Sequence, residues 1–204
     1  GWISRTPYGG YRPEADGSRH WRISESWNWG DPNNGTNFLG RTAAKVAADG
    51  SLDVSVALET VASCVTQIQS VVCARFPLVR YAGGKVVLDG RVEKLLPIAY
   101  EKGKIAVFRE TVRDIALFDK DGRRMLAFRF PKPMSCYLQD NREWKGDESR
   151  YFTLRIPFEG KGMRTHLVRG DAFAMDFNLQ TPGPVAYSDS AYVVEAGDDW
   201  VPLK

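Results

Sequence analysis

The sequence lacks the features that mark membrane-spanning and nucleic-acid-binding proteins. Its 204 residues contain no apolar run of about 18 residues, the length that a helix needs to cross a bilayer. Lysine and arginine exceed aspartate and glutamate only by 28 to 25, and they are spread along the chain. The clustered positive charge that is typical of nucleic-acid binding is therefore missing. We expect neither a membrane nor a nucleic acid as a partner.

Residues that often carry catalysis are also scarce. The two histidines, His20 and His166, lie far apart, and neither is in a metal-ligand pattern. The chain has no Gly-x-Ser-x-Gly motif and no phosphate-binding glycine motif. Glycosidases need two carboxylates at a defined separation, whereas most acidic residues here lie in turn patterns, where aspartate bonds its own backbone. We therefore expect that the chain is not an enzyme.

The three cysteines, Cys64, Cys73 and Cys136, have no Cys-x-x-Cys spacing, so a zinc site is not expected. Each lies in or beside an apolar run, which favours a small buried core residue. One disulfide with a leftover thiol is the alternative. The cysteines therefore do not fix the compartment in which the chain works.

Alternation with a period of two is the main signal after residue 41. Residues 44–48 and 52–58 alternate about Asp49-Gly50, a strong hairpin turn because glycine tolerates positive φ. One face of this hairpin is apolar and the other is polar, as in an antiparallel sheet that is packed on one side. Further strands are expected over residues 65–76, 86–88, 105–108, 112–118, 124–130, 151–158, 171–179, 192–194 and 200–203.

Short strands with turns between them predict a sandwich or a barrel. No segment keeps a helical period, and Pro97 interrupts the best candidate, residues 92–100. We therefore predict an all-β fold, an antiparallel β-sandwich of jelly-roll-like form. It is expected to make a single domain over residues 1–204, in which residues 1–40 are an irregular, aromatic-rich segment with one strand near 21–27.

This first segment holds four of the six tryptophans, among them Trp27 and Trp29. Aromatic rings stack on the flat C–H faces of sugars, and amide groups bond sugar hydroxyls. Trp27 and Trp29 are therefore candidate stacking residues, and Asn33 and Asn37 are candidate hydroxyl ligands. The alternative is that these rings plug one end of the sandwich, because buried indoles also find N–H partners.

A second polar and aromatic cluster lies at residues 136–144. Asp140 and Arg142 are candidate ligands for hydroxyls or a carboxylate, since the arginine fork offers paired donors. Trp144 is a candidate stacking residue. The alternative is an internal salt bridge between Asp140 and Arg142.

Residues 31–37 have the oxygen density of a calcium loop but lack the EF-hand spacing. A plain Asx turn is the alternative. No cofactor is expected, apart from a structural calcium ion if this loop binds one.

Residues 138–144 (LQDNREW) and 151–157 (YFTLRIP) resemble segments of accessory β-sandwich modules in bacterial polysaccharide-degrading enzymes. The order of hairpins from residue 41 to 179 is similar too. The resemblance implies a secreted or cell-surface carbohydrate-binding module, part of a larger multidomain chain, that targets a glycoside hydrolase to polysaccharide. Such modules often carry calcium.

Two other functions stay open at this point. One is a structural β-sandwich domain that packs on a catalytic neighbour. The other is a β-sandwich hydrolase or polysaccharide lyase, in which a tyrosine or histidine base and a basic side chain would act on a uronate.

Overall fold

The computed structural model describes residues 12–13, 19–23, 38–66, 72–157, 165–188, 191–196 and 199–202. Contacts divide the chain into two compact units. The first comprises Gly1–Lys45, Val54–Val71 and Phe158–Asp176, and the second comprises Val46–Asp53, Val72–Pro157 and Phe177–Lys204. Every described strand pair is antiparallel, and the described helices are short. The predicted all-β, antiparallel, sandwich-like fold is confirmed, while the single domain stays a prediction.

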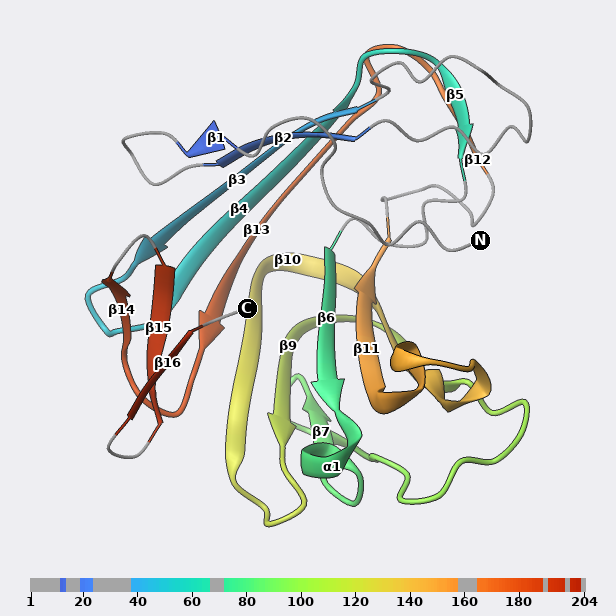
Figure 1. The fold of residues 1–204 in the computed structure, drawn as a ribbon, viewed down its shortest axis with the longest axis vertical. Coiled ribbons are helices and arrows are strands. Elements are labelled where there is room, and N and C mark those ends of the chain that lie inside the picture. The colour runs from blue at the N-terminus through green and yellow to red at the C-terminus, as the bar shows by residue number, and fades with distance from the viewer. Residues whose placement is uncertain are drawn as a thin grey trace. The chain divides into compact units, whose positions relative to one another are not determined.

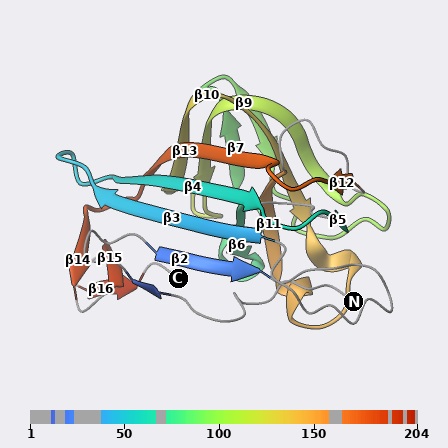
Figure 2. The ribbon, with the colours of Figure 1, turned by 90° about the horizontal axis from the view of Figure 1, so that it is seen from above.

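The first unit is a sheet of neighbouring strands. Its strands are β1 (Arg12–Pro13), β2 (Arg19–Ile23), β3 (Phe38–Val46), β4 (Leu52–Thr60), β5 (Cys64–Thr66), β12 (Thr165–Leu167) and β13 (Ala172–Gln180). The order is β1-β2-β3-β4-β13, and β5 pairs with β12. Strands β2, β3 and β4 lie side by side in both views (Figure 1, Figure 2). The last residues of β13 and the ends of β3 and β4 at the 47–51 turn belong to the second unit.

The second unit holds most of the remaining elements. They are β6 (Val72–Pro77), α1 (Leu78–Tyr81), β7 (Lys85–Leu88), β8 (Val92–Leu95), β9 (Ala106–Phe118), β10 (Arg124–Asp140), η1 (Asn141–Glu143), η2 (Asp147–Arg150), β11 (Tyr151–Ile156), β14 (Val185–Ser188), β15 (Ala191–Ala196) and β16 (Asp199–Pro202). The order is β13-β10-β9-β7-β8, β11 pairs with both β10 and β6, and β14, β15 and β16 form a separate small sheet.

The long β9–β10 pair is the central strand pair of this unit. Its ladder shifts register between Arg129 and Met134, and β10 bends over there (Figure 1). Pro131 and Pro133 lie within the shift, where a missing N–H does not break a ladder bond. The prediction that this strand ends at residue 130 is therefore wrong, as is the separation of residues 105–108 from 112–118. Both pairs of segments are single strands.

The bend brings the two halves of the unit together around an aromatic core. The first half of β10 pairs with β13 and the second half pairs with β11. Phe76 on β6 packs edge-on against Phe128 on β10, with ring centroids 6.5 Å apart. Phe128 also contacts Phe177 on β13 at 5.8 Å. Tyr81 of α1, a helix too short to show a helical period, packs against Phe76 at 5.5 Å.

The alternation predicted from the sequence is confirmed in several strands. Gly50 has φ 79°, as a tight hairpin turn requires, and Leu52, Val56 and Leu58 on β4 are buried. Alternate residues of β11 and β13 are buried in the same way. Cys136 is buried and free, as expected of a core cysteine. The side chains of Cys64 and Cys73 lie outside the described residues.

Strand β8 is the last strand on its side of the sheet. Its exposed side chains include two charged ones that pair across neighbouring strands. Glu93 Oε1 lies 2.8 Å from Lys85 Nζ, and Lys94 Nζ lies 4.0 Å from Glu110 Oε1. No helix in the described part of the chain combines the length and apolar character needed to cross a bilayer.

We expect Phe152→Ala to lower the free energy of unfolding by about 3–5 kcal/mol, because the ring is fully buried and its loss leaves a cavity. The measurement is denaturant unfolding followed by circular dichroism. Val79→Ala is the control, and its change is expected within about 0.5 kcal/mol because Val79 is 81% exposed. Equal losses in the two variants would contradict this account of the core.

Candidate functional site

The candidate residues of the first segment lie outside the described residues. Trp27, Trp29, Asn33 and Asn37 all fall within residues 24–37, as does the calcium-like loop at 31–37. Their roles therefore stay predictions. Within the described ranges, no group of three histidine, cysteine, aspartate or glutamate side chains is placed to hold a metal ion.

Asp140 and Arg142 form an internal ion pair. Arg142 Nη2 lies 2.5 Å from Asp140 Oδ2, and the Asp140 side chain is 1% exposed. The same guanidinium donates to the carbonyls of Ile98, at 2.6 Å, and Pro97, at 2.8 Å. This is the alternative interpretation of the pair, and it ties η1 to the segment after β8. Trp144 is half-buried, and its role, like those of Asp140 and Arg142, in ligand binding stays a prediction.

The neighbouring amides also bond within the protein. Gln139 Nε2 donates to Asn141 Oδ1 at 2.8 Å, and Asn141 Nδ2 donates to Thr153 Oγ1 at 2.7 Å. Arg155 Nε donates to Gln139 Oε1 at 3.1 Å. Buried amides that satisfy one another in this way fix the ends of β10 and β11.

A different surface of the second unit has the shape of a binding site. A groove of about 620 Å³ lies on the sheet face of β7, β9 and β10. We call it the sheet-face trough; it is lined by Val87, Asp89, Gly90, Arg113, Asp114, Ala116, Phe118, Arg124 and Arg129. Its volume is in the range of small-molecule sites, about 300–1,000 Å³.

Strand register explains the trough. Val87 on β7 and Ala116 on β9 lie opposite one another and form a short row of small apolar side chains in the lining. On one side of this row, Phe118 lies opposite both Lys85 and Arg124. Since residues two apart share a face of a sheet, the row of small side chains is the floor, and the larger residues beside it are the walls.

The other wall of the trough is polar. Asp114 on β9 lies opposite Arg129 on β10, which lies opposite Asn178 on β13. Arg129 Nε is 3.1 Å from Asp114 Oδ2. Asn178 Nδ2 donates to Ser51 Oγ at 2.6 Å and to Asp53 Oδ1 at 2.8 Å. A line of planar amide, carboxylate and guanidinium groups therefore runs across the sheet beside the floor.

Two aspartates hold the turns at the ends of the trough. Asp89, at φ 50°, accepts from the backbone N–H groups of Arg113 at 2.8 Å and Asp114 at 3.0 Å. Asp119 Oδ1 accepts from the backbone N–H groups of Asp121 and Arg123, which closes the turn before β10. Burial raises the pKa of Asp119, but these backbone bonds and Arg123 outweigh burial, so the pKa lies below 3.8.

A second hollow of about 550 Å³ adjoins the trough at Arg124, which lines both. Its other walls come from the turns at residues 49–51 and 180–184. Ser51 donates from its hydroxyl and its backbone N–H to Asp49, and these bonds lower the pKa of that carboxyl. Arg124 Nη2 donates to Gln180 Oε1 at 2.9 Å, between the two hollows.

The trough is suited to binding a flat polar ligand. Its floor is apolar, Phe118 is the aromatic part of its wall, and its arginines offer forked donors. Cys136, beyond the register shift on β10, is not a candidate nucleophile, because burial raises its pKa to about 12.

Sequence reasoning missed this trough, although part of its signal is in the chain. Asp114, Ala116 and Phe118 alternate with the buried Ile115 and Leu117, so a polar face with one small residue could have been identified. The opposing residues of β7 and β10 could not, since one strand does not reveal its partners' register.

Comparisons with known proteins give little more. No family model matches the chain, and no curated protein matches it. A solved structure described as a galactose mutarotase related enzyme, from Lactobacillus acidophilus, is similar to it. The likeness covers 82% of this chain and 68% of the other, at 10% sequence identity and a TM-score of 0.34. At that score the likeness supports no particular activity.

One expectation is corrected by this comparison. The sequence predicts that the chain is not an enzyme, whereas the matched structure is described as an enzyme. The prediction of a non-enzyme is therefore wrong, and it is not carried further. The resemblance to carbohydrate-binding modules has no support from a family model.

We expect Arg142→Lys to lower the free energy of unfolding by about 1–3 kcal/mol, because a lysine cannot hold Asp140 and two carbonyls at once. Denaturant unfolding measures the change. Arg150→Lys is the matched control, since Arg150 is 76% exposed and its ion pair is worth little. A stable Arg142→Lys variant would show that the ion pair does not anchor η1.

The stability contributed by Asp119 should depend on pH. Because its folded pKa lies below 3.8, the contribution is complete above about pH 5 and is lost as the pH falls through the folded value. Asp119→Asn should therefore lower the thermal midpoint at pH 7 and reduce its fall on acidification. Asp147→Asn, at an 88% exposed side chain, should leave both unchanged. A parallel pH profile in the wild type and Asp119→Asn would refute the assignment.

Proposed function

We propose that this chain binds carbohydrate in the sheet-face trough, as a domain of a larger, secreted, carbohydrate-active protein. The observation that carries the proposal is the pair of small apolar side chains, Val87 and Ala116, between walls of planar polar groups and a ring. A sugar ring has this same pattern of an apolar face and a polar rim.

The walls supply the groups that sugar hydroxyls require. Asp114 accepts, Arg129 and Arg124 donate in a plane, and Gln180 does both. These side chains are held by each other before a ligand arrives. Pre-formed pairs of this kind reduce the entropy lost on binding.

The trough also fits a polymer better than a small molecule that must be enclosed. It continues through Arg124 into the second hollow, so a ligand longer than one sugar has surface to follow. The proposal is for binding of saccharide.

Affinity electrophoresis against a panel of polysaccharides tests the proposal. The wild type should be retarded by at least one glycan, and Phe118→Ala should weaken that binding about fivefold, as loss of roughly 1 kcal/mol of ring contact predicts. Isothermal calorimetry on the retarding glycan then measures the affinity.

Tyr151→Ala is the matched control. Tyr151 is also a half-buried ring beneath a cation, Arg75 at 5.8 Å, as Phe118 lies beneath Lys85 at 5.4 Å, but it is on β11 and does not line the trough. Retardation by no glycan, with the protein folded, would refute the proposal. An equal loss of glycan affinity in Phe118→Ala and Tyr151→Ala would show that the trough is not the binding site.

A further inference from the structure

The trough has a surplus of positive charge that its own residues do not use. Its lining includes the guanidinium groups of Arg113, Arg124 and Arg129 and the carboxylates of Asp89 and Asp114. The chain as a whole has 28 basic and 25 acidic residues, so it shows no comparable excess. The way these five groups pair decides what charge a ligand meets.

Both carboxylates are engaged by the protein. Asp114 pairs with Arg129 at 3.1 Å. Asp89 accepts from the backbone N–H groups of Arg113 and Asp114, which fix its side chain in its turn. Lys85, beside the Phe118 ring, pairs with Glu93 at 2.8 Å. The two ion pairs are balanced, whereas Asp89 has no ion-pair partner among the described residues and adds one negative charge.

Three arginines against two aspartates leave the lining with a net charge of +1, and Arg113 and Arg124 are the residues that provide it. The described partner of the Arg124 guanidinium is Gln180, which is neutral. Across the described part of the chain, neither Arg113 nor Arg124 makes an ion pair. The two residues stand on different strands, β9 and β10, and both line the trough.

On this basis we infer that the saccharide bound in the trough is anionic, with carboxylate or sulfate groups that Arg113 and Arg124 receive. A guanidinium fork matches the two oxygens of either group. The inference rests on the proposed function and adds the charge of its ligand. The floor of Val87 and Ala116 would lie under the ring, while the acidic substituents reach the two arginines.

The test compares polymers that differ in charge alone. Calorimetry is run with polygalacturonate and its fully methyl-esterified form, and with dextran sulfate and dextran. The anionic member of at least one pair should bind at least tenfold more tightly, and its affinity should fall between 50 and 300 mM salt, about the range over which screening grows. Which pair shows the preference distinguishes carboxylate from sulfate.

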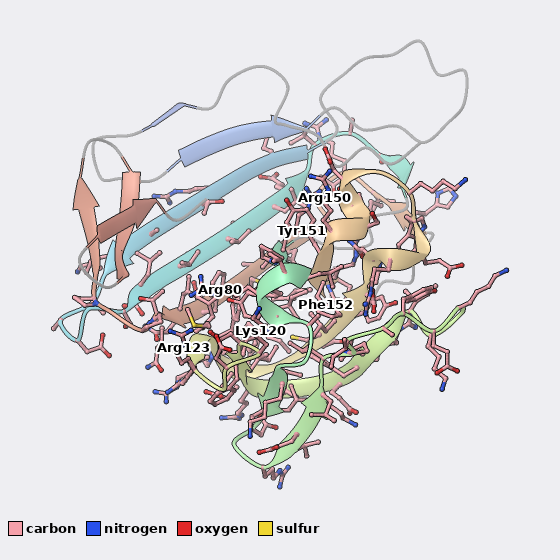
Figure 3. All side chains as sticks on the ribbon, turned by 60° about the horizontal axis from the view of Figure 1, so that its bottom comes forward. Arg80, Lys120, Arg123, Arg150, Tyr151 and Phe152 are labelled. Atoms are coloured by element: carbon pink, nitrogen blue, oxygen red, sulfur yellow. The ribbon has the colours of Figure 1, made fainter. Side chains whose placement is uncertain are left out.

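Arg113→Gln and Arg124→Gln should each weaken binding of the anionic polymer about fivefold, in line with exposed charge pairs, and Arg113→Gln should leave binding of the neutral polymer unchanged. Arg150→Gln removes the same charge from η2. Figure 3 shows Arg150 well separated from Lys120 and Arg123, which lie in the turn just before Arg124. This control should bind as the wild type does.

Several outcomes would overturn the inference. Equal binding of charged and neutral polymers would do so and leave carbohydrate binding standing, whereas binding of no polymer would refute the proposed function itself. An equal loss in Arg150→Gln would reduce the preference to net charge. Single-stranded DNA that binds as tightly as the anionic glycan, and is lost in the same variants, would show a general polyanion surface.

Discussion

The β9–β10 ladder is the contact on which the second unit depends, because both sides of its core are attached to it. The first half of β10 pairs with β13, and the second half pairs with β11, which in turn pairs with β6. The register shift between Arg129 and Met134 lets the two halves of β10 face each other. Phe76 and Phe128 meet across that fold. Without the bend, the apolar faces of β11 and β13 would have no common core to fill.

The same ladder builds the sheet-face trough on its outer side. Ile115 and Leu117 point into the core, so their neighbours Asp114, Ala116 and Phe118 must point outward. Pairing with β7 and β10 then sets a small residue between charged and aromatic ones. The trough thus follows from the alternation of inward and outward side chains on β9, together with the turns that Asp89 and Asp119 stabilise. It does not depend on a separate binding loop.

Much of the fold could be predicted from alternation and turns, as in the hairpin about Gly50 and the buried faces of β11 and β13. Pro131 and Pro133 misled the prediction, because a proline ends a paired strand but not one that is shifting register. The Asp140–Arg142 ion pair was foreseen as an alternative because the residues are two apart. The trough was not, because its lining comes from three strands whose partners only the folded chain reveals.

Strand β8 has a consequence for how the protein behaves in concentrated solution. The outer strand of an open sheet has unpaired backbone N–H and C=O groups, with which a strand of another molecule can pair, and such pairing leads to aggregation. Here that border is four residues long, and Glu93 and Lys94 carry charges on its two faces. A strand from another molecule would have to displace their water and their partners Lys85 and Glu110. Glu93 and Lys94 therefore disfavour pairing at this border, while the exposed Val92 and Leu95 of the same strand favour contact with an apolar surface.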